Sequence, residues 1–461
     1  MKVIWRTLLA LFALLMIPLR TWSQQQNTFI LESPSLADAQ VACQKYGMTL
    51  VSIIHNPDTY LVQISASVDP RSLAEWTKDD PTVKHIEPNK KFKQSRDKGQ
   101  GSILGASAPS STYLSDPNLI SIYGASSIVA YVQQPAFYFT STYSSGVRAG
   151  LRGVGTIAVI DTGVDEQNPI LSRVVVPGYD FTRDLPGYAS DLGDIDQSTA
   201  HILHQSTAHI LHQSTAHILH QLNNSSSAVL DAATANALST TSLPNDFGHG
   251  TMVAGLIHLV APGAKIMSLK AFNADGSGEQ ANVIRAVYFA ADHGVKIVNM
   301  SFGFSNSSDA LMKAINYASR KGVICIASVG NDGESALLYP AAFGNVIGVA
   351  SVNSQYQPSL FTNRGSDLVT IAAPGENLVT TFPGDQYAVA SGTSFSAPLV
   401  AGAASLMLDA ANTDIAAQLQ EADIVRALRR AIPCAPDGSL GAGCMDLAQA
   451  ISFIKSMNMQ H

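Results

Sequence analysis

The sequence is poor in charged residues. Only 14% of its 461 residues are Asp, Glu, Lys or Arg, whereas 46% are hydrophobic, and the formal net charge is -7. The 28 Lys and Arg residues are scattered and form no strongly basic patch, so nucleic acid is not an expected partner. The apolar content is sufficient to bury a large core in one or two domains.

Long apolar runs are also scarce. The one near the N-terminus extends from Leu8 to Leu19, follows the basic residues Lys2 and Arg6, and precedes a candidate cleavage point after Ser23. This pattern over residues 1–23 is typical of a signal peptide. A membrane anchor is the alternative, but the run is too short to span a bilayer comfortably. We expect a secreted or periplasmic protein with no membrane association in its mature form.

Cysteine is rare, with four residues in the chain. Cys434 and Cys444 flank a turn-rich loop, and in an oxidising compartment a disulfide between them and two free thiols are equally reasonable expectations. Cys325 lies in an apolar run and is expected to be inert core, while Cys43 belongs to a separate N-terminal region. Neither is a candidate catalytic residue.

Residues 27–92 have their own pattern of strand, helix, two strands, helix and strand. This order predicts a small α+β domain of the ferredoxin-like kind. Residues 93–114 are rich in Lys, Gly, Ser and Ala without periodicity, which predicts an exposed, cleavable linker.

Residues 115–455 alternate continuous apolar runs with helical stretches. Strands are expected at 155–161, 265–272, 295–301, 322–328 and 345–351, and helices at 280–293, 309–321, 394–408 and 422–432. Apolar strands alternating with helices predict an α/β fold, in which helices cover both faces of a doubly wound parallel sheet. Active sites in such sheets gather at the carboxyl ends of the strands.

An insertion at 190–243 interrupts this pattern. The octapeptide STAHILHQ occurs three times in tandem from Ser198 to Gln221 and contains histidines at positions 201, 204, 209, 212, 217 and 220. Histidines three residues apart could share a helix face and bind a metal. However, an eight-residue period drifts by about 80° per repeat on an α-helix, so the pairs would not stay in register. A duplicated surface insertion is therefore favoured over a metal array.

Four short motifs carry polar residues to strand ends or helix starts. Ser394, in SGTSFSAP, begins a helix, whose free N–H groups and partial positive charge suit an anionic intermediate. Asp161 ends a strand in AVIDTGVD, and His249 begins a helix in GHGTMVAG. Asn331 follows a core strand in SVGNDG. Each motif alone has an ordinary structural explanation, such as a helix cap or a turn.

Together, and in this order, the motifs resemble those of the subtilisin-like serine peptidases. NMSFG, YPA and AAPG match further landmarks of that family, and GAGCMDLAQA resembles its closing segment. The resemblance covers about residue 115 to the C-terminus, apart from the insertion. It implies a serine endopeptidase that hydrolyses peptide bonds through an acyl-enzyme, with protein or peptide substrates.

The resemblance also implies the role of each residue. Ser394 would be the nucleophile, His249 the general base, and Asp161 the group that orients the imidazole. Asn331 and the backbone N–H of Ser394 would form the oxyanion hole. Two segments would line the substrate cleft, where the substrate chain adds as a strand; their residues are Ser301, Phe302, Gly303, Ala327, Ser328 and Gly330.

The N-terminal domain resembles the family's inhibitory propeptide, which assists folding and leaves its tail in the cleft. The chain would thus be a self-processing zymogen with its own propeptide as partner; a permanent binding domain is the alternative. No cofactor is expected to be required. The loop that holds a tight calcium ion in many members of the family is missing from VAGLIHLVAPGAKI, so no metal ligand is expected there. Weaker calcium sites elsewhere stay open.

Two other classes of function make different predictions from the peptidase. A non-catalytic, subtilisin-shaped binding protein would be expected to lose Asp161, His249 or Ser394, and all three are present. A histidine-repeat metal binder would respond to metal through positions 201 to 220. The sequence favours the exported endopeptidase.

Overall fold

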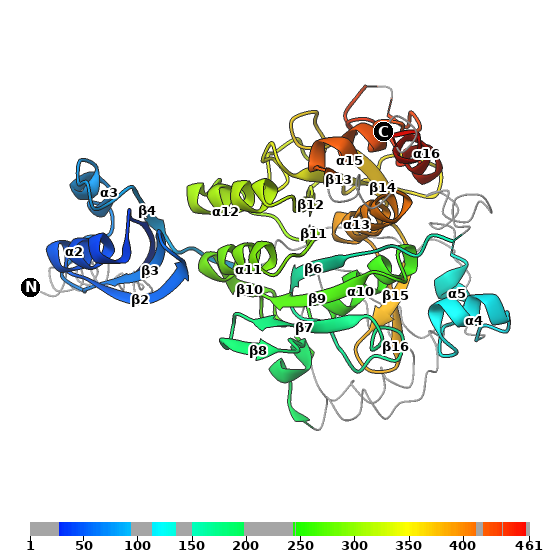
Figure 1. The fold of residues 1–461 in the computed structure, drawn as a ribbon, viewed down its shortest axis with the longest axis horizontal. Coiled ribbons are helices and arrows are strands. Elements are labelled where there is room, and N and C mark those ends of the chain that lie inside the picture. The colour runs from blue at the N-terminus through cyan, green and yellow to red at the C-terminus, as the bar shows by residue number, and fades with distance from the viewer. Residues whose placement is uncertain are drawn as a thin grey trace, which may run out of the picture. The chain divides into compact units, whose positions relative to one another are not determined.

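The computed structural model describes residues 27–93, 113–134, 150–197, 243–244, 246–411, 418–435 and 437–457. The expected signal peptide, the STAHILHQ repeats and most of the expected linker lie outside these residues. The chain divides into two compact units, Met1–Lys90 and Lys91–His461 (Figure 1). Lys91 and Phe92, which the sequence assigns to the first domain, belong to the second unit because they pair with a strand of it.

The first unit is an antiparallel sheet with two helices. Its elements follow the predicted order: β1 (Thr28–Glu32), α2 (Leu36–Tyr46), β2 (Met48–His55), β3 (Thr59–Ile64), α3 (Leu73–Thr77) and β4 (His85–Pro88). The strand order is β2-β3-β1-β4. The Ser35 side chain caps α2 by accepting from the Asp38 N–H, and Gly47, with φ of 64°, ends the helix in the left-handed conformation.

The second unit is built on an eight-stranded sheet of order β14-β13-β12-β11-β6-β9-β7-β8. All neighbouring strands are parallel except β7 and β8. The strands are β6 (Thr156–Asp161), β7 (Val175–Asp180), β8 (Leu185–Gly187), β9 (Lys265–Lys270), β11 (Ile297–Met300), β12 (Ile324–Ser328), β13 (Ile347–Val352) and β14 (Ile371–Pro374).

Helices cover both faces of this sheet (Figure 1). On one face α10 (His249–Val260) packs against α13 (Thr393–Ala410), and α13 also contacts β11 to β14. On the other face α11 (Gln280–Asp292) packs against α12 (Asp309–Arg320). All of α10 and nearly all of α13 are buried, because small residues allow the two helices to approach closely. The predicted doubly wound α/β fold is confirmed.

Several short elements were not predicted. They are β7, β8 and β14 of the central sheet, together with β5 (Lys91–Lys93), α4 (Pro117–Tyr123), α5 (Val129–Val132), the 3₁₀ helix η1 (Asp191–Asp194), β10 (Ser277–Glu279), β15 (Leu378–Phe382), β16 (Gln386–Ala390) and α16 (Leu447–Met457). The largest error in a predicted boundary concerns the helix expected at 422–432, which is α15 (Glu421–Leu428). It ends early because the backbone of Ile432 pairs with that of Cys444.

Cys434 and Cys444 form a disulfide. Cys444 lies beside Ala372 of the edge strand β14 and forms backbone bridges with Ala372 and Ile432. Cys43 and Cys325 are free and buried. Burial raises the pKa of the Cys325 thiol to about 12, so it is unreactive, as the sequence predicts. Within the described ranges, no helix is both long enough and apolar enough to cross a membrane.

We expect the α13 core to be intolerant of cavities. Leu406 is 1% exposed and belongs to the main hydrophobic core. Leu406→Ala should lower the free energy of unfolding by about 2–5 kcal/mol, measured by guanidinium denaturation. Leu360→Ala is the matched control, because Leu360 is 91% exposed, and it should change stability by less than about 0.5 kcal/mol. Equal effects of the two substitutions would contradict this account of the core.

Candidate active site

A carboxylate and an imidazole meet at the carboxyl end of the sheet. Asp161 is the last residue of β6 and His249 is the first residue of α10. Asp161 Oδ1 accepts a hydrogen bond from His249 Nδ1 at 2.7 Å. The two side chains are 1% and 2% exposed. The Thr162 N–H also donates to Asp161 Oδ1 at 2.7 Å. Water is thus excluded from a charge-assisted contact that fixes the orientation of the imidazole.

Glycines on either side of His249 allow this approach. Gly248 has φ of 84°, a conformation that side chains other than glycine rarely adopt. A Cβ atom on Gly250 would lie 2.1 Å from the carbonyl oxygen of Gly163, in the turn that follows Asp161. The turn and the start of α10 can therefore pack together only because residue 250 has no side chain.

Ser394 is the second residue of α13 and is buried at the start of that helix. Its Oγ donates to the Ser301 carbonyl at 3.2 Å, while the Ser301 hydroxyl donates to the Ser394 carbonyl at 2.8 Å. The ring of Phe395, the next residue, lies 5.4 Å from the His249 ring. The structure thus brings the starts of α10 and α13 together at the end of β11.

Asn331 is held beside Ser394. Its Oδ1 accepts from the Thr393 N–H at 2.8 Å, which leaves the amide Nδ2 as its donating end. The loop that carries Asn331 is fixed by Asn363, whose Oδ1 accepts from the N–H groups of Asp332 and Glu334. Asn363 is fully buried and was missed in the sequence, because its partners lie about thirty positions away.

The residues predicted to line the substrate cleft follow β11 or lie at the end of β12. Ser301, Phe302, Ala327 and Ser328 are buried, whereas Gly303 and Gly330 are half-buried. Gly330 is anchored to the start of α13, because its N–H donates to Thr393 Oγ1 at 3.1 Å.

The strand β10, which was not predicted, belongs to a separate two-stranded sheet. Within the second unit it pairs antiparallel with β5, so that Gly278 is opposite Phe92. The Phe92 ring stacks on Phe304 with centroids 3.8 Å apart, and Phe302 lies 5.4 Å from Phe304. Residues 91–93 therefore occupy this edge as an added strand with one aromatic anchor.

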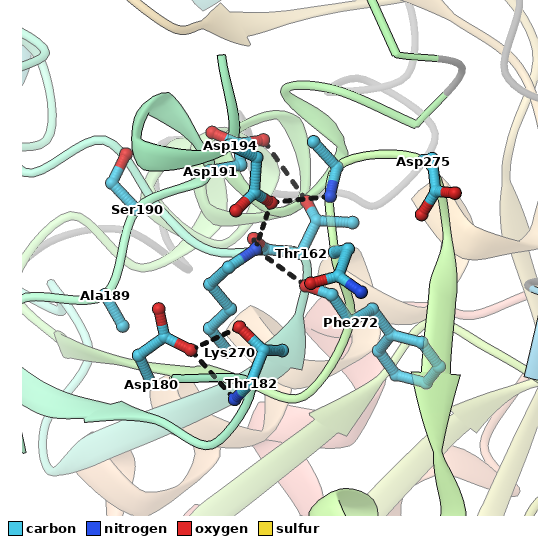
Figure 2. A network of polar contacts seen from close by, with 12 residues as sticks. Thr162, Asp180, Thr182, Ala189, Ser190, Asp191, Asp194, Lys270, Phe272 and Asp275 are labelled. Atoms are coloured by element: carbon cyan, nitrogen blue, oxygen red, sulfur yellow. Dashed lines mark hydrogen bonds and ion pairs between the residues drawn. The ribbon is translucent and has the colours of Figure 1, made fainter. Parts of the chain in front are cut away.

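An ionic network lies beside Thr162, the residue that follows Asp161 (Figure 2). Lys270, the last residue of β9, is fully buried, and its Nζ donates to Asp194 Oδ2 at 2.7 Å and to the carbonyls of Thr162 and Phe272. Asp194 also accepts from the Ala274 N–H and pairs with Arg183. A lysine inside the apolar run KIMSLKAF was the signal in the sequence, because a buried ammonium requires a carboxylate partner.

Asp191, at the start of η1, is the second carboxylate in this network. Its Oδ2 accepts from the Gly248 N–H at 2.5 Å and from the Thr162 hydroxyl at 3.3 Å. Burial is the main cause that raises its pKa to about 7, although the nearby Lys270 charge and the Gly248 N–H oppose the shift. The sequence places residue 191 in the insertion at 190–243 and predicts no helix there.

The connection from α10 to β9 contains Ala261, Pro262, Gly263 and Ala264, none of which has an oxygen-bearing side chain. The side chains of these four residues therefore supply no oxygen ligand for calcium. Among the residues that the structure describes, no cluster of three or more His, Cys, Asp or Glu could hold a metal ion. The expectation that no cofactor is required stays a prediction.

The fold and the site define an α/β protein in which Asp, His and Ser gather at the carboxyl end of a parallel sheet. The model of the subtilase family, peptidase S8, matches residues 153–443. The chain belongs to the subtilase family.

Similar proteins agree with this assignment. The chain is 32% identical over 261 residues to thermitase from Thermoactinomyces vulgaris, covering 54% of this chain and 74% of thermitase. It is also 32% identical over 259 residues to the thermophilic serine proteinase of Bacillus sp. (strain AK1), covering 56% of this chain and 53% of that protein. The match thus spans about half the length of the second relative.

Solved structures share the fold. Fervidolysin from Fervidobacterium pennivorans, a keratinolytic enzyme related to subtilisin, superposes with a TM-score of 0.64 at 19% identity, over 92% of this chain and 61% of that chain. The epidermin leader peptide processing serine protease of Staphylococcus aureus has a TM-score of 0.61 at 19% identity, over 92% and 98% of the two chains.

We expect Gly250 to be irreplaceable. Gly250→Ala forces its Cβ against the Gly163 carbonyl and should lower the free energy of unfolding by about 1–3 kcal/mol, measured by denaturant titration. Gly344→Ala is the matched control, because a Cβ there meets no atom within 4 Å, and it should leave stability within about 0.5 kcal/mol of the wild type. Equal stability of the two variants would show that the close approach of Gly250 to the Gly163 carbonyl does not contribute to the free energy of unfolding.

Proposed function

We propose that the protein is a serine endopeptidase that hydrolyses peptide bonds through an acyl-enzyme intermediate. The observation that carries the proposal is the buried contact of 2.7 Å between Asp161 and His249, beside a serine that begins a helix. Membership of the subtilase family supports it. This chemistry uses only groups of the chain and requires no cofactor.

In this mechanism His249 takes the proton from Ser394 as the hydroxyl attacks the substrate carbonyl. His249 then returns the proton to the leaving amine, and a water molecule hydrolyses the acyl-enzyme by the same steps in reverse order. Asp161 keeps the proton on the Nδ1 side of the imidazole and stabilises the imidazolium. The hydrogen bond from Ser394 Oγ to the Ser301 carbonyl is exchanged for one to His249 when the hydroxyl reacts.

The oxyanion that forms would be held by the Asn331 amide and the Ser394 N–H. The first is oriented by its bond to Thr393, and the second lies at the N-terminus of α13, where the helix dipole favours negative charge. Loss of one such donor typically lowers turnover by about 10²–10³, a magnitude established on subtilisin itself.

We propose further that the chain is made as a zymogen, with residues 27–92 as its inhibitory propeptide. The pairing of β5 with β10 supports this, because residues 91–93 occupy a strand edge in the way a peptide substrate would. Cleavage after this strand would convert the substrate-like tail into a bound product. The protein substrates of the mature enzyme would replace it there.

We propose that the protein is exported. The signal-peptide pattern of residues 1–23 supports a secreted or periplasmic location. The disulfide between Cys434 and Cys444 agrees with an oxidising compartment.

The decisive test compares the full precursor with Ser394→Ala. We expect the wild type to shorten to a mature form, followed by intact mass spectrometry, and then to hydrolyse casein. Ser394→Ala should remain at precursor length and be inactive, because it has no nucleophile. Shortening of both proteins would show that another protease processes the chain. A folded wild type that never cleaves casein would favour the non-catalytic binding protein.

The added strand gives a second prediction. Phe92→Ala should slow self-processing of the precursor about fivefold or more, because the stacked ring contributes on the order of 1 kcal/mol beyond its buried area. The rate of precursor loss by mass spectrometry measures it. Lys91→Ala is the control: Lys91 makes an exposed ion pair with Glu279 at 3.6 Å, whose loss should have little effect. Unchanged processing of Phe92→Ala would contradict the substrate-like role of β5.

A further inference from the structure

Asp191 is connected to both residues that flank His249. Its Oδ2 accepts directly from the Gly248 N–H at 2.5 Å. The same oxygen accepts from the Thr162 hydroxyl, and Thr162 Oγ1 in turn accepts from the Gly250 N–H at 3.2 Å. One carboxylate therefore holds the backbone on both sides of His249, directly at Gly248 and through Thr162 at Gly250. We call this arrangement the Asp191 bracket.

The Asp191 bracket is also connected to Asp161 through Thr162. Thr162 is the residue after Asp161, and its N–H donates to Asp161 Oδ1. A Cβ on Gly163 would lie 2.6 Å from the backbone nitrogen of Asp191, so η1 is seated directly on the turn after β6. Asp191 thus contacts the two segments that supply the carboxylate–imidazole pair.

The surroundings of Asp191 disfavour the ionised form of its side chain. The side chain is fully buried, and Oδ1 has no hydrogen-bond partner among the described residues. The charged groups around it are Lys270 from β9, Asp194 from η1 itself and Asp165 from the segment after β6, with Asp161 and His249 on the elements that it brackets. The Lys270 ammonium forms its ion pair with Asp194, with Nζ 2.7 Å from Oδ2, and not with Asp191 (Figure 2).

We propose that Asp191 is a positioning residue, which as a carboxylate holds both sides of His249 and as a neutral acid holds them less firmly, so that turnover depends on its protonation. The inference rests on the proposed peptidase function. A carboxylate accepts N–H and O–H bonds about twice as strongly as a neutral group. Burial raises the pKa of this carboxyl to about 7, so the firm bracket forms as the pH rises through 7 and weakens as the pH falls.

The test compares wild type with Asp191→Asn, a variant of the same shape that never carries the charge. Both are assayed on fluorescently labelled casein between pH 5.5 and 8.5, with rates expressed per active molecule. We expect the ratio of wild-type to variant kcat to rise from about one at pH 5.5 to several-fold at pH 8.5, with KM little changed. In the matched control Asp180→Asn, a buried carboxyl that accepts from Thr182 and Arg183, the ratio should not vary with pH.

A pair of substitutions at Thr162 keeps the proposal testable if Asp191→Asn fails to fold. Thr162→Val removes the hydroxyl that links Asp191 to Gly250 and should lower kcat at pH 8.5. Thr162→Ser retains the hydroxyl and should restore kcat. Equal kcat in the two variants would contradict the bracket.

Thermal unfolding in a Ser394→Ala background supplies a readout independent of catalysis. The raised pKa means that ionising Asp191 costs stability, and this cost is absent below the ordinary carboxyl range and complete above about pH 7. Asp191→Asn should therefore raise the unfolding temperature above that of its parent by a larger margin at pH 8.5 than at pH 5.5, where only part of this cost is present. A lower unfolding temperature at pH 8.5 would show that the carboxylate serves the fold and would overturn the inference.

The outcomes separate the two proposals. If the wild type cleaves casein and the kcat ratio is constant across pH, or KM changes in place of kcat, the role of Asp191 is wrong and the peptidase function stands. If the folded wild type does not cleave casein at any pH, the peptidase function fails, and the role of Asp191 fails with it.

Discussion

Removal of carboxylates from water is the constraint on which the carboxyl end of the sheet depends. Asp161, Asp191 and Asp194 all lie there, and an unpaired buried carboxylate would cost several kcal/mol. Each is therefore held by donors from another element: the His249 ring, the Gly248 N–H and the Lys270 ammonium. These bonds join β6, β9, η1 and α10 in one arrangement. The glycines at 163 and 250 are required because the bonds are short and leave no room for side chains.

Most of the fold could be predicted because a parallel sheet is buried on both faces. Its strands are continuous apolar runs, and all five predicted ones are strands of the central sheet, with ends shifted by a few residues. Elements with short or mixed patterns escaped prediction, including β7, β8 and the β15–β16 hairpin. The end of α15 was missed because it is set by the distant partner of Ile432 and not by local propensity.

The site could be predicted only as far as its motifs are local. Asp161, His249, Asn331 and Ser394 each stand in a run of distinctive small residues, and the structure places the four around the ends of β6, β11 and β12. Asp191, Lys270 and Asn363 act through partners far away in sequence, so no short pattern marks them. Only the lysine within an apolar strand gave a sign that carboxylates must lie nearby.

The edge of the sheet at β14 has a different kind of protection. Backbone N–H and C=O groups on an open strand edge can recruit strands of other chains and start aggregation. Here residues 442–445 run along β14, where the Ala372 N–H donates to the Gly443 carbonyl and the Met445 N–H to the Ala372 carbonyl. The disulfide ties this covering segment to Cys434, ten residues earlier. The bridge therefore also protects the sheet edge: in a reducing environment only backbone hydrogen bonds would hold the covering segment on β14.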